Sequence, residues 1–561
     1  MKVSELPYRR ATLEEARSGM EEIISRVKNA GSVQDVLDAR EDYLKLMVEL
    51  STARALASMR YTINTADEFY TGENDYYDEV SPAFFQLDVQ YASALLDSPF
   101  RAELEKALSP VLFKSMEVQR KSMSPDIVED MAEENKLTSE YAKLMSAMEV
   151  EFRGEKMPRP MIGKYLKSGD RETRKEAMEA LGRTMESYAE QLDSLYDRLV
   201  HVRDRMARKM GYRNFVELGY YRMGRLCYDQ DSVEVFRKNV IDDLVPVVAR
   251  LRTENARRMG IDHFMFYDND IIIPGGDPCP VDKEGIFAAA REMYHAMGEE
   301  TGAFIDLMLE NDAFDVDSRK NKCGGGYCTE FVKYRQPFIF ANFNGTAGDV
   351  DVVTHEAGHA LNAYLIAENR FALELQCGGM ETAETHSMSM EFFAWPYMEK
   401  FFGEGAAKYR YMHALDSLSF IPYGTMVDAF QHIVYENPDL TPAQRNEEWL
   451  KLEHQFRPHI DFEGIPYLEK GTRWQYQMHI YEAPFYYVDY CLAQTAAFAF
   501  LLASQEDYAG AFARYMNLSR QGGEKLWTEL LEEAGIPSPF TPGALKDLAA
   551  RVEALLEKLK V

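Results

Sequence analysis

The segment that decides the fold reads DVVTHEAGHALNAY and runs from Asp351 to Tyr364. It contains the pattern His-Glu-x-x-His, formed by His355, Glu356 and His359. Residues four apart lie on one face of a helix, about one turn from each other, so both imidazoles can reach a single metal ion. Apolar residues around them give the helix faces to bury. The pattern therefore predicts a buried helix that carries two ligands of one metal ion.

Glu356 directly follows the first histidine, where its carboxylate can reach a metal-bound water without binding the metal. A zinc ion lowers the pKa of such a water towards ~7, and the carboxylate accepts the proton as the water attacks a carbonyl carbon. We therefore expect a zinc hydrolase in which Glu356 is the general base. Asp351 or Thr354 is expected to cap the start of this helix.

A catalytic zinc site needs a third protein ligand and one open position. A second helical run starts at Met380, and it carries Glu381, Glu384 and Glu391 on roughly one face. Helical geometry alone leaves all three open as the third ligand. His386 lies on another face and is expected to be packed or at the surface.

Helical periodicity dominates the rest of the chain. From Leu192 to Met206, apolar residues recur at spacings of three and four with charged residues between them, which is typical of an amphipathic helix. Thr541-Pro542 is expected to start the last helix. The same periodicity predicts helices at Thr12–Asn29, Val33–Met59, Gln86–Ala107, Arg171–Met185 and Glu284–Asn311.

Only one part of the sequence is typical of strands. Tyr327–Tyr334 and Phe338–Phe343 are aromatic and β-branched and are separated by Arg335-Gln336-Pro337, so we expect a short hairpin or small sheet beside the metal helix. The fold class expected from the whole chain is therefore mostly α.

The best candidate for a boundary is Met157-Pro158-Arg159-Pro160, because its prolines cannot continue a helix. We divide the chain there into an N-terminal helical region, residues 1–160, and a catalytic region, residues 161–561.

Composition narrows the class of protein. The chain is 46% apolar with 28% charged residues, as expected of a folded globular protein. Its net charge of −29 disfavours nucleic acids and anionic membranes as partners. The apolar stretch Ala496–Ala503 is shorter than the ~20 residues of a membrane span, and Met1–Ser18 has no apolar core of a secretory signal. With six cysteines in 561 residues, free thiols in a reducing cytoplasm are the expectation.

Four motifs occur in an order that resembles the oligoendopeptidase F branch of the thimet oligopeptidase-like zinc metallopeptidases. These are Pro337–Thr346, His355–His359, the pattern Glu384-x-x-Ser387-x-x-x-Glu391, and His479–Tyr490. The resemblance extends from Asp170 to about Ala503.

The resemblance assigns residues that spacing alone leaves open. It places the third ligand of one zinc ion on Glu384 and gives Glu391 the role of holding a ligand imidazole. Glu381 is then expected to be a surface or cleft charge. It also implies that side chains of the last motif bind the substrate carbonyl and stabilise the oxyanion. For that role we expect His479, Tyr490 and Tyr487, with Tyr486 next, while core packing remains the alternative for each of these tyrosines and for Tyr481.

The resemblance further implies a two-lobed helical body around a deep central channel, with the zinc site on its floor. Such a channel admits short unfolded peptides and excludes folded proteins. An extended peptide is expected to pair with an exposed edge of the strand Phe338–Phe343.

We therefore expect a cytoplasmic zinc endopeptidase that cleaves oligopeptides. A peptidyl-dipeptidase or carboxypeptidase is the nearest alternative, but it needs a cation to hold the terminal carboxylate, and the sequence does not identify one. A non-catalytic helical peptide-binding protein is less favoured, because Glu356 would have no use there. The sequence leaves the oligomeric state open.

Overall fold

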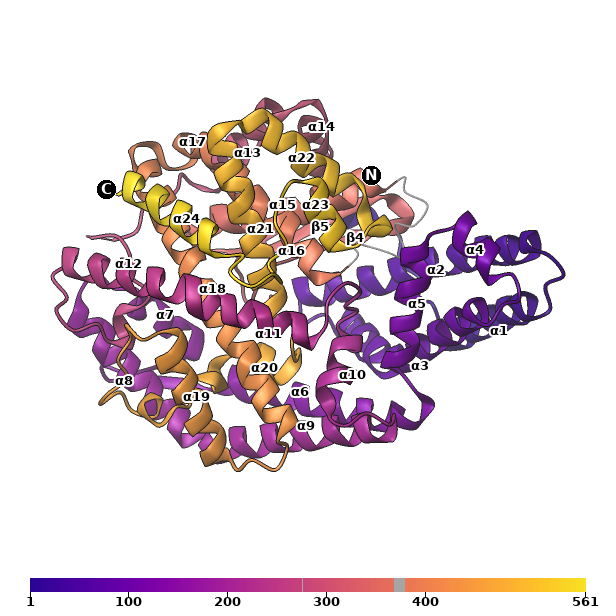
Figure 1. Ribbon diagram of the computed structural model, residues 1–561, viewed down its shortest axis with the longest axis horizontal. Helices are drawn as coiled ribbons and strands as arrows, with labels where there is room; N and C mark the ends of the chain where they lie inside the picture. Colours follow the sequence, from indigo (N-terminus) through magenta and orange to yellow (C-terminus); the bar gives the residue numbers. More distant parts are fainter. Residues whose placement is uncertain (275, 368–378, 561) are drawn as a thin grey trace.

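The computed structural model describes residues 1–274, 276–367 and 379–560. Helices dominate these residues, and the expected mostly α fold is confirmed (Figure 1). The helices of the first half are α1 (Leu13–Lys28), α2 (Val33–Ile63), α3 (Glu68–Leu96), α4 (Arg101–Ala107), α5 (Pro110–Ser122), α6 (Val128–Ala147), α7 (Gly163–Leu166), α8 (Arg171–Ser187), α9 (Ala189–Lys209), α10 (Phe215–Arg222), α11 (Gln230–Asn239) and α12 (Val245–Arg258).

The second half contains most of the helices around the predicted site. They are α13 (Lys283–Met297), α14 (Glu299–Glu310), α15 (Gly348–Ile366), α16 (Met380–Phe393), α17 (Met398–Phe402), α18 (Ala406–Glu436), α19 (Pro442–Phe456), α20 (Met478–Glu482), α21 (Tyr487–Glu506), α22 (Tyr508–Arg520), α23 (Trp527–Glu533) and α24 (Lys546–Leu559). Within the described residues, α21 is the one helix long and apolar enough to span a membrane, and most of it is buried inside the protein.

Three of the expected helix bounds were wrong. The helix expected at Gln86–Ala107 is divided between α3 and α4, because Pro99 cannot continue α3. The helix expected at Glu284–Asn311 is divided at Gly298, whose backbone is extended. Thr541-Pro542 does not start the last helix. Instead Asn239 holds these residues in a turn, donating to the Thr541 carbonyl and accepting from the Gly543 N–H.

The helices α1 to α5 form an arm beside the larger body (Figure 1). In that view α6, α9, α10 and α19 make the lower half of the body, and α13, α14, α17 and α22 make the upper half. Between the arm and the body lies a cavity of about 790 Å³, lined by α2 and α3 on one side and by the predicted site on the other. The expected division at residue 160 remains a prediction. A two-stranded hairpin, β1 (Glu149–Phe152) and β2 (Glu155–Pro158), lies just before it.

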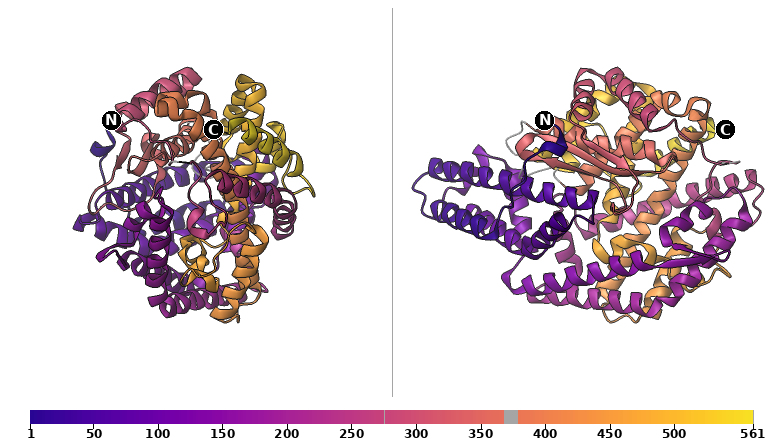
Figure 2. Two further views of the ribbon diagram at one scale, coloured as in Figure 1. Left: turned by 90° about the vertical axis from the view of Figure 1, so that its left-hand side faces the viewer. Right: turned by 180° about the vertical axis from the view of Figure 1, so that it is seen from behind.

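A three-stranded sheet borders this cavity, and its strand order corrects one expectation. It consists of β3 (Phe314–Asp317), β4 (Tyr327–Phe331) and β5 (Gln336–Phe343) in the order β3-β5-β4. The strand β5 is parallel to β3 and antiparallel to β4, so it is the central strand and not the exposed edge that was expected. The edge strands are β3 and β4, and of these β4 lines the cavity. The sheet lies beside the arm (Figure 2).

The metal-motif helix α15 begins earlier than expected. It starts at Gly348, so Asp351 and Thr354 lie inside it and cap nothing. The Asp349 carboxylate instead accepts the N–H groups of Asn344 and Gly345, at 2.9 and 2.7 Å, and fixes the turn before the helix. Asp351 faces inward, where it accepts the hydroxyl of Tyr409.

Candidate metal centre

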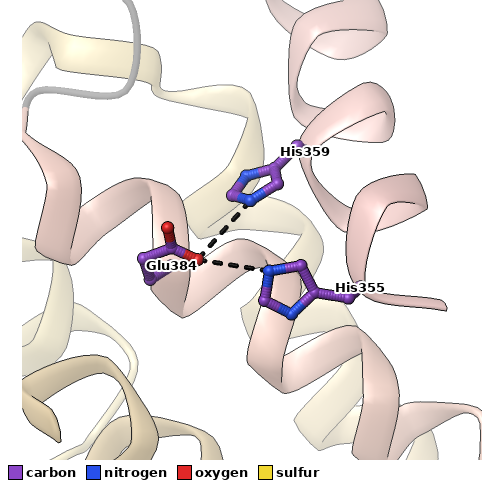
Figure 3. Close-up of side chains that lie close together, drawn as sticks. All are labelled: His355, His359 and Glu384. Atoms are coloured by element: carbon purple, nitrogen blue, oxygen red, sulfur yellow. Dashed lines mark ion pairs between the residues drawn. The ribbon is translucent and has the colours of Figure 1, made fainter. Parts of the chain in front are cut away.

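The two histidines of α15 and a glutamate of α16 converge at the floor of the cavity. Figure 3 shows His355 and His359 pointing from one helix towards Glu384 on the next. The Glu384 Oε2 lies 3.3 Å from His355 Nε2 and 3.5 Å from His359 Nε2. One ligand atom from each residue lies within 4.8 Å of the others. Of the three candidate glutamates, Glu384 is therefore the one that meets both imidazoles.

Gly358 allows α15 and α16 to approach closely enough for these three side chains to converge. A Cβ atom at Gly358 would lie 2.6 Å from Ser387 Cα and 2.7 Å from the His386 carbonyl oxygen. Only a residue without a side chain lets the backbones of α15 and α16 approach this closely. The helix crossing at Gly358, between the two histidines, brings Glu384 within reach of both of them.

Burial and hydrogen bonds fix the charges of this cluster. Burial alone would lower the pKa of His355, but hydrogen bonds with Glu384 and Glu391 raise it well above its ordinary value. Burial alone would raise the pKa of Glu384, but both histidines hold it well below its ordinary value. Two imidazole nitrogens and an ionised carboxylate form the donor set that zinc prefers, so the residues fit such an ion.

A chain of hydrogen bonds orients the first imidazole, and part of it was missed from the sequence. The His355 Nδ1 donates to Glu391 Oε1 at 2.6 Å, and the other oxygen of Glu391 accepts from His413 Nε2 at 2.7 Å. Trp395 Nε1 donates to His413 Nδ1 at 3.0 Å. Although burial alone would raise the pKa of Glu391, the two histidines lower it to about 2. An ionised Glu391 keeps the Nε2 lone pair of His355 directed at the metal position.

Glu356 lies in the same cavity but does not belong to the cluster. Its side chain is 8% exposed, and burial raises its pKa above the ordinary value. The start of β4 is close by, because a Cβ atom at Gly326 would lie 3.6 Å from Glu356 Oε1. A carboxylate with a raised pKa, in the cavity that holds the metal position, is suited to accept a proton during a reaction.

The tyrosines of the last motif divide between two cavities. The Tyr486 hydroxyl donates to Glu384 Oε1 at 2.8 Å and lines the large cavity. Tyr490 lines this cavity and also a smaller neighbouring one of about 390 Å³. Tyr487 and His479 line only the smaller cavity, with their ring centroids 4.9 Å apart. Tyr481 is fully buried and stacks on Tyr141 in the core.

The backbone before α21 explains this division. Phe485 has a positive φ of 67°, a conformation that is rare for a bulky residue. The Arg225 guanidinium donates to the Phe485 carbonyl oxygen at 2.5 Å, and Gln431 Oε1 accepts its N–H at 2.8 Å. Gly219 leaves room for the ring, since a Cβ atom there would lie 2.6 Å from it. The resulting turn directs Tyr486 to the metal cluster, which helical spacing could not predict.

Two further polar residues singled out in α16, Glu381 and His386, are buried. Glu381 was expected to be a surface or cleft charge, and this was wrong: it is 1% exposed and lies 3.5 Å from the Tyr228 hydroxyl. Burial, with the nearby Asp489, raises its pKa to about 8. His386 is fully buried, in agreement with packing, and burial lowers its pKa to about 3.

A His-His-Glu cluster at a cavity, with a further glutamate in the same cavity and a strand edge along it, is typical of metallopeptidases. The M3 peptidase N-terminal domain matches residues 3–123, and peptidase family M3 matches residues 291–549. The chain therefore belongs to peptidase family M3, in its oligoendopeptidase F branch. No curated protein matches it.

Solved structures share the whole fold. An X-ray structure of a protein assigned as oligoendopeptidase F is 43% identical, with a TM-score of 0.94, over 99% of both chains. PZ peptidase A, solved with an inhibitor, is 41% identical over 99% of both chains, with the same TM-score. An oligoendopeptidase F assignment from Bacillus anthracis str. Ames is 37% identical, with a TM-score of 0.90, over 100% of this chain and 99% of that chain.

Proposed function

We propose that this metallopeptidase is a zinc-dependent endopeptidase that cleaves internal bonds of short peptides. The observation that carries the proposal is the convergence of His355, His359 and Glu384, with Glu356 in the same cavity. The three converging residues would hold the ion. When bound, zinc would supply a Lewis acid that polarises the scissile carbonyl and lowers the pKa of water.

Glu356 moves the proton. Its carboxylate accepts a proton from the water that attacks the carbonyl carbon, and then donates it to the nitrogen of the leaving amine. The raised pKa of Glu356 favours both steps, because the carboxyl group must hold the proton between them.

Phenol and imidazole groups are suited to stabilise the oxyanion that develops on the carbonyl oxygen. Tyr490 and Tyr486 line the cavity of the metal cluster, and His479 lies next to both, with ring centroids 6.3 and 5.7 Å away. We therefore assign this role to Tyr490, Tyr486 and His479. Tyr487 remains a candidate that acts from the smaller cavity.

The free edge of β4 would hold the peptide backbone. Its residues 327 to 330 line the large cavity together with the metal cluster, so an extended peptide paired with β4 would pass the site. Backbone hydrogen bonds give affinity with little sequence preference. A cavity between the arm and the body also limits substrates to unfolded peptides.

One observation favours the exopeptidase alternative. Arg54 on α2 is the only Lys or Arg side chain among the described residues that line the large cavity. It is exposed there, so it is free to bind the terminal carboxylate of a peptide. Arg54 is therefore the candidate for the cation that this alternative requires and that the sequence did not identify.

Mass spectrometry of a peptide library distinguishes these functions. The library contains short peptides with free ends, the same peptides blocked at both ends, and a folded protein. Internal cuts in blocked peptides, absent in the Glu356→Gln variant and in the folded protein, would support an endopeptidase. If peptides are cut only near free C-termini, and these cuts are lost in Arg54→Gln, the exopeptidase function would replace the proposed endopeptidase function. No cleavage by the zinc-loaded protein would refute both. A cytoplasmic location remains a prediction.

A further inference from the structure

A short chain of hydrogen bonds leads away from the cavities behind His479. The Gln477 Nε2 lies 2.8 Å from His479 Nδ1, and the Oε1 of the same amide lies 2.8 Å from the Tyr423 hydroxyl. Gln477 is 8% exposed, so water competes little for its amide. The amide therefore bridges the phenol of α18 and the imidazole of α20.

The surroundings of Tyr423 determine which groups donate and which accept along these hydrogen bonds. The guanidinium groups of Arg457 and Arg473 lie over the Tyr423 ring, with their Cζ atoms 4.8 and 5.5 Å from its centroid. Burial raises the pKa of Tyr423, so the phenol keeps its proton, although both guanidiniums oppose that rise. Because an amide oxygen only accepts, the Tyr423 hydroxyl donates that proton to Gln477 Oε1. The amide nitrogen then faces His479.

This direction determines where the imidazole carries its proton. An amide nitrogen only donates, so His479 Nδ1 must be the acceptor, and a neutral ring then carries its proton on Nε2. Burial lowers the pKa of His479, which keeps the ring neutral near pH 7. Within the described part of the chain, Nε2 has no hydrogen-bond partner. The ring lines the smaller cavity beside Tyr487 and Tyr490, so this N–H is available to a ligand.

We propose that Tyr423 and Gln477 are positioning residues that fix His479 as the Nε2–H tautomer, whose free N–H donates to a carbonyl oxygen of the bound peptide. The inference rests on the proposed peptidase function. The opposite tautomer would present a lone pair to the same oxygen and repel it. A neutral donor has a further advantage, because it does not compete with the metal position for Glu384.

The tautomer is measured directly by NMR of the zinc-loaded protein labelled with ¹⁵N-histidine. The His479→Gln variant identifies the signals of His479 among those of the 11 histidines. We expect an unprotonated Nδ1 and a protonated Nε2. In Tyr423→Phe the amide is free to turn, so signals of both tautomers are expected, with kcat lower by about 10-fold and KM within about twofold.

The chain offers a matched control. Tyr467 donates to Gln475 in the same way that Tyr423 donates to Gln477, but that pair is buried away from both cavities. Tyr467→Phe should leave the His479 signals unchanged and kcat within about twofold. If Tyr467→Phe lowers kcat as much as Tyr423→Phe, the loss reflects general packing and the proposal is wrong.

Two further results would overturn the proposal: a protonated Nδ1 in the wild-type protein, or a Tyr423→Phe variant with mixed tautomers and unchanged kcat. Failure of the peptidase function is recognised separately. If the zinc-loaded protein has the Nε2–H tautomer but cleaves no peptide, the tautomer assignment stands. Donation from that N–H to a substrate carbonyl would then be refuted.

Discussion

Gly358→Ala tests whether the close crossing of α15 and α16 positions the metal ligands. The new Cβ atom would lie 2.6 Å from Ser387 Cα, and ordinary contact needs about 3.4 Å, so the helices must separate by about 0.8 Å there. The neighbours are backbone atoms, which cannot turn aside. Overpacking of this kind costs about 1–3 kcal/mol, offset by about 0.5–1 kcal/mol that alanine contributes in a helix.

The larger effect should fall on the metal. Metal–ligand distances tolerate about ±0.2 Å, whereas Glu384 lies less than one turn before Ser387 and would move with it. We expect at least about 10-fold weaker zinc binding, measured by competition with a chromophoric chelator. The matched control is Gly72→Ala in α3, where a Cβ atom meets nothing within 4 Å. It should be stabilising and leave zinc affinity unchanged. Wild-type affinity and thermal stability in Gly358→Ala would show that the helices adapt and that the crossing does not set the ligand geometry.

Four further predictions concern charge and metal. Glu356→Gln should bind zinc normally while kcat falls by about 10²–10⁴-fold; equal turnover in the variant would remove Glu356 as the base. Glu391→Gln should weaken zinc binding by about 10–100-fold in the chelator assay, because His355 loses its ionised acceptor; unchanged affinity would contradict this. Because the raised pKa of His355 keeps that ring protonated in the metal-free protein, zinc must displace a proton, and affinity should rise by about tenfold per pH unit above about pH 6.5 until that pKa is reached. A flat profile would mean that the ring is already neutral. The folded-state pKa of Glu381, about 8, lies above its unfolded value, so the stability it contributes is present at low pH and is lost as pH rises through about 8. Glu381→Gln should remove this part of the decline in Tm between about pH 5 and pH 9, and parallel Tm curves would refute it.

The sequence was sufficient to predict features that depend on residue spacing within a single helix. The spacing of His355, Glu356 and His359 predicted a helix with both imidazoles on one face, and the structure has that helix. It did not predict where the helix begins. A capping role for Asp351 competes with a buried hydrogen bond to Tyr409, 58 residues away, and the tertiary contact decides.

Other errors have the same cause. Glu381 looks like any charged residue of an exposed helix face, but α16 lies between α15 and α21 and is buried on nearly all sides. Likewise, β5 was expected to offer an edge because β3 carries no strong strand signal and pairs with β5 only through tertiary contact. The contact of His413 with Glu391 and that of Trp395 with His413 had no sequence signal at all.

By itself, the sequence determined the mostly α class, the His-Glu-x-x-His helix and, through four ordered motifs, the family. These features depend on periodicity and on spacing within single elements, and both can be read from the order of the residues. Only the tertiary structure decided that Glu384 meets the two histidines, that the Tyr486 hydroxyl donates to Glu384, and that β4 is the edge strand along the cavity. Each of these depends on how two elements approach one another. That approach is set by backbone contact at Gly358 and by the strained turn at Phe485, and neither has a periodic signature in the sequence.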